Sequence, residues 1–545
     1  MKHYTSASAD KPDTPAKPVK PVKPVKIDFD GIQQRIVALP VAERNYDALA
    51  VASDGSLFYL DRSQPGASNE PPEAESTGNG ELHRFSFEDR KSKALKSGVS
   101  QFNLSADGKK LLLQYLRGKL EIADASEKLD AKPIDLAQVG MQVNPREEWQ
   151  QIFDETWWME KEFFYDANLH GIDWNAIRTR YQPLLKHVQR REDLNDVLAE
   201  MIGELQVGHN NVSGGDVHRE RPSQVGLLGA DFVVDNGRYR IKTIYGGDRW
   251  SPFLLAPLAV AGLGVKEGEY ILDINGQSLT SSQNLYALLA NTVGKQISLR
   301  VGNNANVVGA RNITVVPIAS EAALRQWHWI EKNRQYVDKV SGGKIAYVYL
   351  PDTGGNGFRY FNRMFYAQTD KQGVIVDDRR NNGGQAANYV VDVLSRPHLA
   401  SWKDRDGLTF DTPGGAIYWP KAMLIDQDAG SGGDFLPYAF KRMGLGPLIG
   451  KRTWGGLIGI SANPNLIDGG NLTVPYFRFF TPEREWRIEN EGTAPDIDVE
   501  LEPIEVNRGR DTQLDAALQS VMQRLQSEKS TTRGVPPAMP TQLGK

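Results

Sequence analysis

The sequence of 545 residues predicts a multidomain α+β protein. Short strand-and-turn patterns fill the first part of the chain, and helical periodicity follows them. The last third alternates short apolar strands with helices, a pattern typical of an α/β layer. Apolar residues make up 40% of the chain and charged residues 24%, as in globular proteins.

Composition excludes several classes of function. The formal net charge of −4 provides no basic surface for nucleic acid and no general attraction to anionic membranes. The chain has no cysteine, which excludes disulfides, zinc–cysteine sites, iron–sulfur clusters and thiol catalysis. We therefore expect no metal, no cofactor, no nucleic-acid partner and no membrane partner.

The amino-terminal part predicts a linker and a β-rich segment. Residues 1–27, which contain a Pro-Val-Lys repeat at 17–26, should form an extended Pro- and Lys-rich linker. Within 28–140, Asp54-Gly55 and Asp107-Gly108 predict tight turns between strands and lie 53 residues apart. That spacing suits blades of a partial β-propeller, so we expect the chain to begin inside a larger protein. A small free-standing β domain is the alternative.

Residues 141–222 predict a helical bundle. Pro145 should open a helix, and a second helix should follow Asp193 as its cap. His209 is the one histidine of eight that sits in a helix-terminating Gly-His motif, which makes it the candidate base. The first helix buries one face, made of Trp149, Ile152, Phe153, Trp157, Phe163 and Phe164.

Residues 223–319 resemble a PDZ domain. The resemblance rests on the loop ahead of the first strand and on Val265–Gly276, where glycines turn the chain around a buried strand. A helix at 281–289 and a final strand at 296–301 should complete the domain. PDZ domains hold a peptide carboxylate in backbone amides, here those of Gly226, Leu227, Leu228 and Gly229. A packing module with a blocked groove is an equal alternative.

Residues 320–528 predict the α/β domain, with buried strands at 344–350, 373–377 and 422–425, and 529–545 a disordered tail. A glycine-rich turn separates the third strand from a helix and raises Ser431, the candidate nucleophile. The amide of Gly432 is one candidate oxyanion donor, and the Gly383-Gly384 turn offers the other. The acids near the end of the domain that could orient an imidazole are Glu489 and Glu491.

Residues 145–505 resemble the carboxy-terminal half of tricorn-type serine proteases, which are relatives of the C-terminal processing peptidases. The resemblance rests on Phe163–Trp174, Gly203–His209, Arg379–Gln385, Ala429–Asp434, Gly444–Gly456 and Ile488–Asp496. It implies a crotonase/Clp-like α/β protease domain that acts on peptide substrates. It also implies a homo-oligomer, a hexamer in the family, and a cytoplasmic location.

The same resemblance assigns roles to the candidate residues. Ser431 would be the nucleophile, His209 the base and Glu489 the acid of the charge relay. Gly432 with Gly383 or Gly384 would supply the oxyanion hole. The archaeal pattern has a serine before the histidine, and this chain has Gly208 there instead.

Two further positions decide between mechanisms and specificities. Arg452 occupies the position of the lysine that C-terminal processing peptidases use as base, and an arginine cannot lose its proton in the working range. We therefore expect a histidine-dependent serine peptidase. The alternatives are a Ser–Lys peptidase using the adjacent Lys451 and a PDZ-containing scaffold with an inactive protease domain. Asp404 and Asp406 would either select basic P1 side chains or form a solvated turn.

Overall fold

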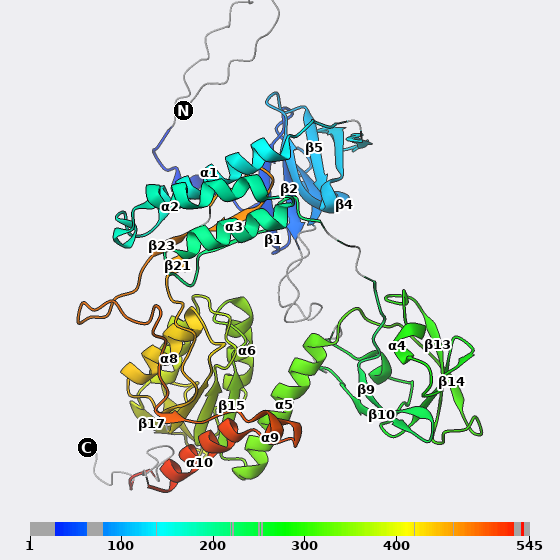
Figure 1. Ribbon diagram of the computed structural model, residues 1–545, viewed down its shortest axis with the longest axis vertical. Coiled ribbons are helices and arrows are strands. Elements are labelled where there is room, and N and C mark those ends of the chain that lie inside the picture. The colour runs from blue at the N-terminus through cyan, green and yellow to red at the C-terminus, as the bar shows by residue number, and fades with distance from the viewer. Residues whose placement is uncertain are drawn as a thin grey trace, which may run out of the picture. The chain divides into compact units, whose positions relative to one another are not determined.

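The computed structural model describes residues 28–527, apart from 63–79, 138, 219, 221–222, 249–250, 252–253, 419 and 461–462, together with 536–538. The described residues fall into two compact units, one of 28–62 with 80–136 and one that begins after 136 (Figure 1). The predicted linker at 1–27 lies outside the described residues, as does the predicted tail except for 536–538. No helix among the described residues is both long and apolar enough to cross a membrane.

The first unit is an antiparallel meander in which each strand pairs with the next along the chain. The predicted Asp-Gly turns are confirmed, because Gly55 and Gly108 adopt positive φ between paired or neighbouring strands. Strand β4 changes partner along its length, pairing with β3 through Val99 and with β5 from Val99 onward. The strands are β1 (Asn45–Val51), β2 (Leu57–Arg62), β3 (Gly80–Ser86), β4 (Lys91–Leu104), β5 (Lys110–Tyr115), β6 (Leu120–Asp124) and β7 (Lys132–Pro133).

The second unit begins with the helices α1 (Pro145–Phe163), α2 (Trp174–Tyr181) and α3 (Arg191–Gly203). Pro145 opens α1 as predicted, and the preceding Asn144 accepts a hydrogen bond from the amide of Arg146. Helix α3 begins earlier than predicted. Asp193 lies inside its first turn, where its carboxylate accepts the amides of Gln189 and Arg190.

An antiparallel sheet of order β14-β13-β11-β10-β9 follows, with β12 beside β11. Its helix α4 (Leu285–Leu288) is shorter than the predicted 281–289, because Asn284 caps it. The predicted last strand is β13 (Ile297–Gly302), and a further strand, β14 (Arg311–Val315), was missed. The remaining strands are β9 (Ala230–Asp235), β10 (Arg238–Ile244), β11 (Tyr270–Ile274) and β12 (Gln277–Ser278).

The α/β part is built on a parallel sheet of order β15-β16-β19-β20-β24. The three predicted strands are present as β15 (Ile345–Tyr349), β16 (Gly373–Asp377) and β19 (Lys421–Ile425), and all three are fully buried. The other strands are β20 (Leu448–Gly450) and β24 (Ile497–Asp498), and the helices are α5 (Ala322–Val340), α6 (Gly355–Tyr366), α7 (Ala387–Ser395), α8 (Gly432–Arg442), α9 (Pro503–Asn507) and α10 (Thr512–Ser527).

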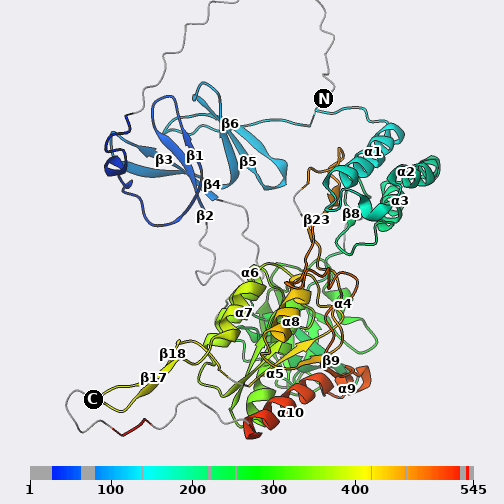
Figure 2. The same cartoon turned by 90° about the vertical axis from the view of Figure 1, so that its left-hand side faces the viewer.

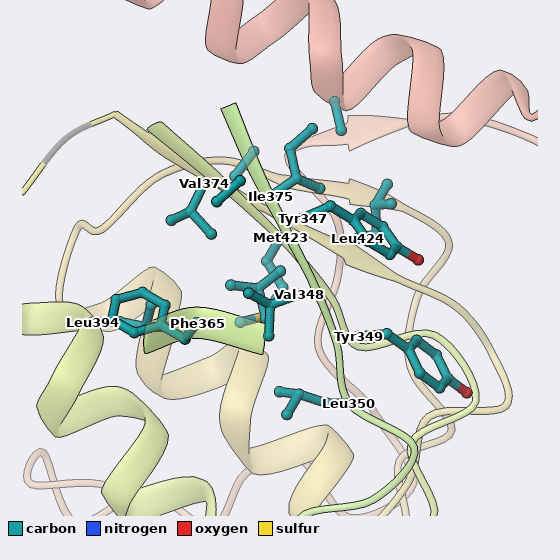
Figure 3. Packing of buried hydrophobic residues seen from close by; sticks show 14 of the residues in the cluster. Tyr347, Val348, Tyr349, Leu350, Phe365, Val374, Ile375, Leu394, Met423 and Leu424 are labelled. Carbon is teal, nitrogen blue, oxygen red and sulfur yellow. The ribbon is translucent and has the colours of Figure 1, made fainter. Parts of the chain in front are cut away.

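Helices cover both faces of this sheet. Figure 3 shows Phe365 of α6 and Leu394 of α7 on one side of the strands, and helix α10, in faint pink, on the other. Strands buried on both faces require continuous apolar runs, which is why the sequence pattern located them. The carboxyl ends of β16 and β19 lead directly into the turns that carry the candidate site residues.

A long segment of the α/β part leaves the parallel sheet between residues 459 and 477 and packs against helices α1 and α3. We call this segment the excursion. Strand β22 (Asn471–Thr473) pairs antiparallel with β8 (Asn211–Ser213), which begins two residues after His209. Leu466, Leu472 and Val474 enter the core formed by α1 and α3. The excursion also carries β21 (Gly459–Ile460) and β23 (Pro475–Phe477), drawn in orange in Figure 1. It ties the candidate base to the domain that carries Ser431.

Candidate active site

Ser431 lies on a sharp turn between a buried strand and a helix. Strand β19 ends at Ile425 and α8 begins at Gly432. Ser431 has φ 57° and ψ −115°, a conformation that L-residues rarely adopt. Strained serines at strand-to-helix turns are typical of nucleophiles, because the turn exposes the hydroxyl above the sheet.

A buried carboxylate holds this turn. Asp434 is fully buried, and Oδ2 accepts the amide of Ser431 at 2.8 Å and that of Gly456 at 3.0 Å. Oδ1 accepts the amide of Gly455 at 2.8 Å and the hydroxyl of Thr453. Burial raises the pKa of Asp434, although all four donors favour the carboxylate. Asp434 therefore joins the Ser431 turn to the 453–456 loop.

The Gly383-Gly384 turn packs directly against Ser431. A methyl group at Gly383 would lie 2.5 Å from Ser431 Cβ, and one at Gly432 would lie 2.8 Å from Gly384 N. The Gly383 amide donates to Asn381 Oδ1 at 2.8 Å. Among the described residues, no hydrogen bond is recorded for the amides of Gly384 and Gly432. Of the two predicted glycines, Gly384 therefore has the available amide.

Asn381 aligns the two turns. Its side-chain oxygen accepts the Gly383 amide, and its carbonyl accepts the Gly430 amide at 3.0 Å. Its side-chain nitrogen Nδ2 donates to Oδ1 of Asp378 at 2.7 Å. Both Asn381 and Asp378 are completely buried, and burial raises the pKa of Asp378 well above its ordinary range.

His209 is partly buried next to this turn. Its ring lies 5.3 Å from the ring of Trp454, between centroids, and its Nδ1 is buried without a partner among the described atoms. Burial lowers the pKa of His209, while the charges of Glu489 and Asp434 act in the opposite direction. The imidazole is therefore biased toward the neutral form that can accept a proton. Within the described part of the chain, no hydrogen bond joins it to Ser431.

Glu489 is buried, but it does not bind the imidazole in this structure. Its Oε1 accepts the amide of Gly208 at 2.9 Å. Its Oε2 accepts the amides of Leu457 at 2.7 Å and Ile458 at 2.9 Å. We expected Glu489 to contact the His209 ring. Its carboxylate instead accepts backbone amides, one of which belongs to the residue before His209. The other acid, Glu491, is exposed and pairs with Arg487 at 3.3 Å.

Comparison with known proteins places this arrangement in a family. Residues 145–203 match the tricorn protease C1 domain, 226–320 the tricorn protease PDZ domain, and 344–499 peptidase family S41. The chain belongs to the tricorn protease family. The three matched regions coincide with the helices, the five-stranded sheet with β12, and the parallel sheet with its site turns.

Individual relatives agree with this assignment. Tricorn protease homolog 1 of Streptomyces coelicolor is 33% identical over 526 residues, covering 94% of this chain and 48% of the relative. The putative tricorn-like protease C-terminal subunit of Sulfurisphaera tokodaii is 31% identical over 521 residues, covering 93% and 58%. The crystal structure of the tricorn protease superposes with a TM-score of 0.77 at 27% identity, covering 88% of this chain and 47% of that one. The chain thus spans about half the length of the tricorn relatives it matches.

In this tricorn family member, the ammonium group of Lys451 forms ion pairs with two carboxylates. Its Nζ pairs with Asp498 at 2.7 Å and with Glu500 at 3.1 Å. These two carboxylates raise the pKa of Lys451, which keeps the ammonium protonated. Arg452 donates to the carbonyl of Glu491 at 3.0 Å. Neither side chain is arranged to take a proton from Ser431.

The tricorn PDZ domain has an occupied carboxylate loop. The amide of Gly226 donates to Leu289 O and that of Leu227 to Ile318 O, each at 2.8 Å. The amide of Gly229 donates to Oε1 of Glu321 at 2.7 Å. The predicted loop, Gly226 to Gly229 with Leu228 at its centre, therefore already holds a carboxylate of its own chain. The geometry favours the blocked-groove interpretation of the sequence.

Asp404 and Asp406 lie on a separate hairpin of the tricorn fold. Strands β17 (Ala400–Lys403) and β18 (Thr409–Thr412) form it, and it projects away from α8 in Figure 2. Asp404 Oδ1 accepts the amide of Leu408 at 2.8 Å, and both acids are exposed. The structure does not bring them to the Ser431 turn, and they form the solvated turn that was the alternative.

Sequence reasoning missed several residues that build the site. Asp434 belongs to the Ala429–Asp434 motif that indicated Ser431. An acidic residue at the third position of a helix is a capping signal that could have identified it. Asn381 and Trp454 also stood in quoted motifs, but nothing in the sequence pointed to their contacts. Among the described residues, no group of three or more His, Asp or Glu side chains is arranged to hold a metal ion.

Proposed function

We propose that the chain is a tricorn-type serine peptidase that hydrolyses peptide bonds in unfolded or oligopeptide substrates through an acyl-enzyme on Ser431. The observation that carries the proposal is the strained Ser431 turn packed against the Gly383-Gly384 turn. The amides of Gly432 and Gly384 lie at this junction and have no recorded acceptor among the described residues. Such amides stabilise the oxyanion of a tetrahedral intermediate.

The proposed reaction is covalent acyl transfer. His209 accepts the proton of Ser431 Oγ, which attacks the substrate carbonyl. The carbonyl oxygen becomes an oxyanion held by the Gly432 and Gly384 amides. His209 returns the proton to the leaving amine, and a water that His209 deprotonates then releases the acid.

Glu489 acts in this proposal as a positioning residue. Its carboxylate fixes the Gly208 amide and therefore the backbone on which the imidazole is carried. Catalytic hydrogen bonds are often long in the free enzyme and tighten when substrate binds. The proposal therefore requires the imidazole to approach Ser431 Oγ in the substrate complex.

The test is covalent labelling with a fluorophosphonate probe, followed by mass spectrometry to locate the adduct. We expect an adduct on Ser431 in the wild-type chain, none in Ser431→Ala, and labelling slowed at least about 100-fold in His209→Ala. Lys451→Ala is the matched control and should label at the wild-type rate. If Lys451→Ala abolishes labelling while His209→Ala spares it, the Ser–Lys alternative replaces this mechanism. A folded chain that is never labelled supports the scaffold alternative.

We further propose the three features that the resemblance implies. The first unit is part of a β-propeller, supported by the change of partner along β4: its first part completes a set of four strands with β1–β3, and its last part begins a second set of four with β5–β7. The chain assembles as a homo-oligomer, a hexamer by resemblance, and works in the cytoplasm. Light scattering of the purified chain and fractionation of expressing cells test the last two. A structure of the complete assembly tests the first.

A further inference from the structure

One aromatic side chain borders both the candidate base and the nucleophile turn. Trp454 follows Thr453, and its amide donates to the carbonyl of Ala429 at 2.9 Å. Half of its surface is exposed. Three glycines lie against the indole: Gly208 and Gly430, which come from distant segments, and Gly456, two residues further along its own loop.

The indole lies where a side chain at each of these glycines would be, most closely at Gly430 and Gly456. A methyl group at Gly430 would lie 2.5 Å from Cε3 of Trp454, and one at Gly456 would lie 2.2 Å from Cζ3. A methyl group at Gly208 would lie 3.1 Å from both Cη2 and Cζ2. The first two distances are far inside van der Waals contact, and the third requires the ring to move by a few tenths of an ångström.

The same indole borders the imidazole. The centroids of the Trp454 and His209 rings are 5.3 Å apart, with the planes inclined by 54°. The charges that act on His209 come from Glu489 and Asp434, which hold the loops on either side. Those carboxylates bind backbone amides, so neither fixes the orientation of the imidazole. Trp454 is the ring contact recorded for His209 among the described residues.

We propose that Trp454 is a positioning residue for His209: its indole is the surface that holds the imidazole beside Ser431, and Gly208 and Gly430 are glycines because the indole occupies their side-chain space. The inference rests on the proposed function, since it assigns a residue that acts through the proposed base. Trp454 also shields the imidazole from water. This shielding is consistent with a burial that lowers the pKa of His209.

The test combines substitutions at Trp454 with substitutions at Gly208. Phenylalanine lacks the outer ring atoms Cη2 and Cζ2, so it makes room for a methyl group at position 208. We expect fluorophosphonate labelling of Ser431 to slow at least about tenfold in Trp454→Ala and less in Trp454→Phe. Gly208→Ala should slow labelling in the wild-type background and have a clearly smaller effect in the Trp454→Phe background. Gly203→Ala, at a glycine with no atom within 4 Å, is the matched control and should change nothing.

The second readout is independent of activity. The pKa of the His209 ring, followed by NMR and assigned with His209→Gln, should rise in Trp454→Ala as water reaches the imidazole. The acid limb of the labelling profile should move to higher pH by the same amount. The inference is overturned if Trp454→Ala leaves the pKa of His209 unchanged, or if Gly208→Ala has the same effect in both backgrounds. Failure of the proposed function would instead appear as an unlabelled wild-type chain, and the NMR titration would still decide the role of Trp454.

Discussion

The backbone amide of Ser431 donates a 2.8 Å hydrogen bond to Oδ2 of Asp434, three residues further along the chain. The same carboxylate accepts the amides of Gly455 and Gly456 and the hydroxyl of Thr453. One buried side chain thus holds the strained nucleophile turn and the loop that carries Trp454. The proposed site therefore depends on this carboxylate as well as on Ser431 and His209.

Asp434→Asn tests this dependence. The amide nitrogen of asparagine would face donors where the carboxylate presents an acceptor. We expect a loss of about 2–4 kcal/mol in the free energy of unfolding, because hydrogen bonds to a buried charge are lost and donors are left unsatisfied. Denaturant unfolding measures it, with labelling of Ser431 reduced in parallel. Asp428→Asn alters an exposed acid of the same turn and should be neutral. Equal behaviour of the two variants would contradict this role.

The buried ion pair between Arg191 and Asp468 should stabilise the attachment of the helices to the α/β excursion. Arg191 Nε lies 2.6 Å from Asp468 Oδ2, and both side chains are almost fully buried. Asp468→Ala leaves a buried guanidinium without its partner and should cost about 3–5 kcal/mol. The double variant Arg191→Met/Asp468→Ala should recover part of this loss, because no charge remains buried.

A solvent-exposed ion pair between helices α1 and α2 serves as the control for the buried pair. Arg178 and Asp154 form an ion pair whose side chains are 37% and 41% exposed. Asp154→Ala should cost about 0–1 kcal/mol, because solvent screens such a pair. Denaturant unfolding compares the variants. If Asp468→Ala is as mild as Asp154→Ala, the buried pair does not stabilise this attachment.

Glu160 predicts a pH dependence of stability. Its side chain is completely buried, Oε2 has no partner among the described atoms, and burial raises its pKa to about 8. The folded chain therefore binds a proton between about pH 4.5 and 8 that the unfolded chain releases. The stabilisation that comes from protonated Glu160 is complete below the pKa that this side chain has in the unfolded chain. It is lost as the pH rises through the pKa that Glu160 has in the folded chain.

Glu160→Gln removes this proton exchange. Relative to the wild type, the variant should gain up to about 1.4 kcal/mol in the free energy of unfolding for each pH unit between about 5 and 8. Urea unfolding at pH 5.5, 7 and 8.5 measures the difference. A difference that is constant across this range would show that Glu160 is ionised in the folded chain.

Glu321 should decide how the PDZ domain treats peptide carboxyl ends. Its Oε1 accepts the amides of Gly229 and Ala230, and its Oε2 is held by Arg325 at 2.6 Å. We expect the wild-type chain to bind a fluorescent hexapeptide with a free carboxyl end no more tightly than the same peptide amidated. Glu321→Ala should create a preference of about tenfold for the free acid, because two amides then lack an acceptor.

The conservative control keeps the acceptor in place. Glu321→Gln retains an oxygen for the two amides and should show no preference between the peptides. Fluorescence anisotropy on the full chain measures all three proteins. A wild-type preference for the free acid would mean that peptides displace Glu321, and the blocked-groove interpretation would then be wrong.

The sequence determined the features that depend on neighbours along the chain. Continuous apolar runs located β15, β16 and β19, because strands buried on both faces need them. Pro145 gave the start of α1, and the Asp-Gly pairs gave two turns. The glycine-rich turn after β19 indicated Ser431, since close approach and positive φ both leave a mark in local sequence.

The tertiary structure alone decided the contacts on which the site depends. Glu489 reaches the Gly208 amide across 281 residues, and Trp454 meets Gly208 and Gly430 from a third segment. The family resemblance placed Glu489 in the charge relay, and the fold shows that its carboxylate accepts backbone amides. The sequence weighed a free and a blocked PDZ groove equally, and in the fold Glu321, at the start of α5, binds the Gly229 amide of that loop. Local sequence reports backbone conformation and burial, but the partner of a buried polar group is set by whichever distant segment packing brings within hydrogen-bond reach.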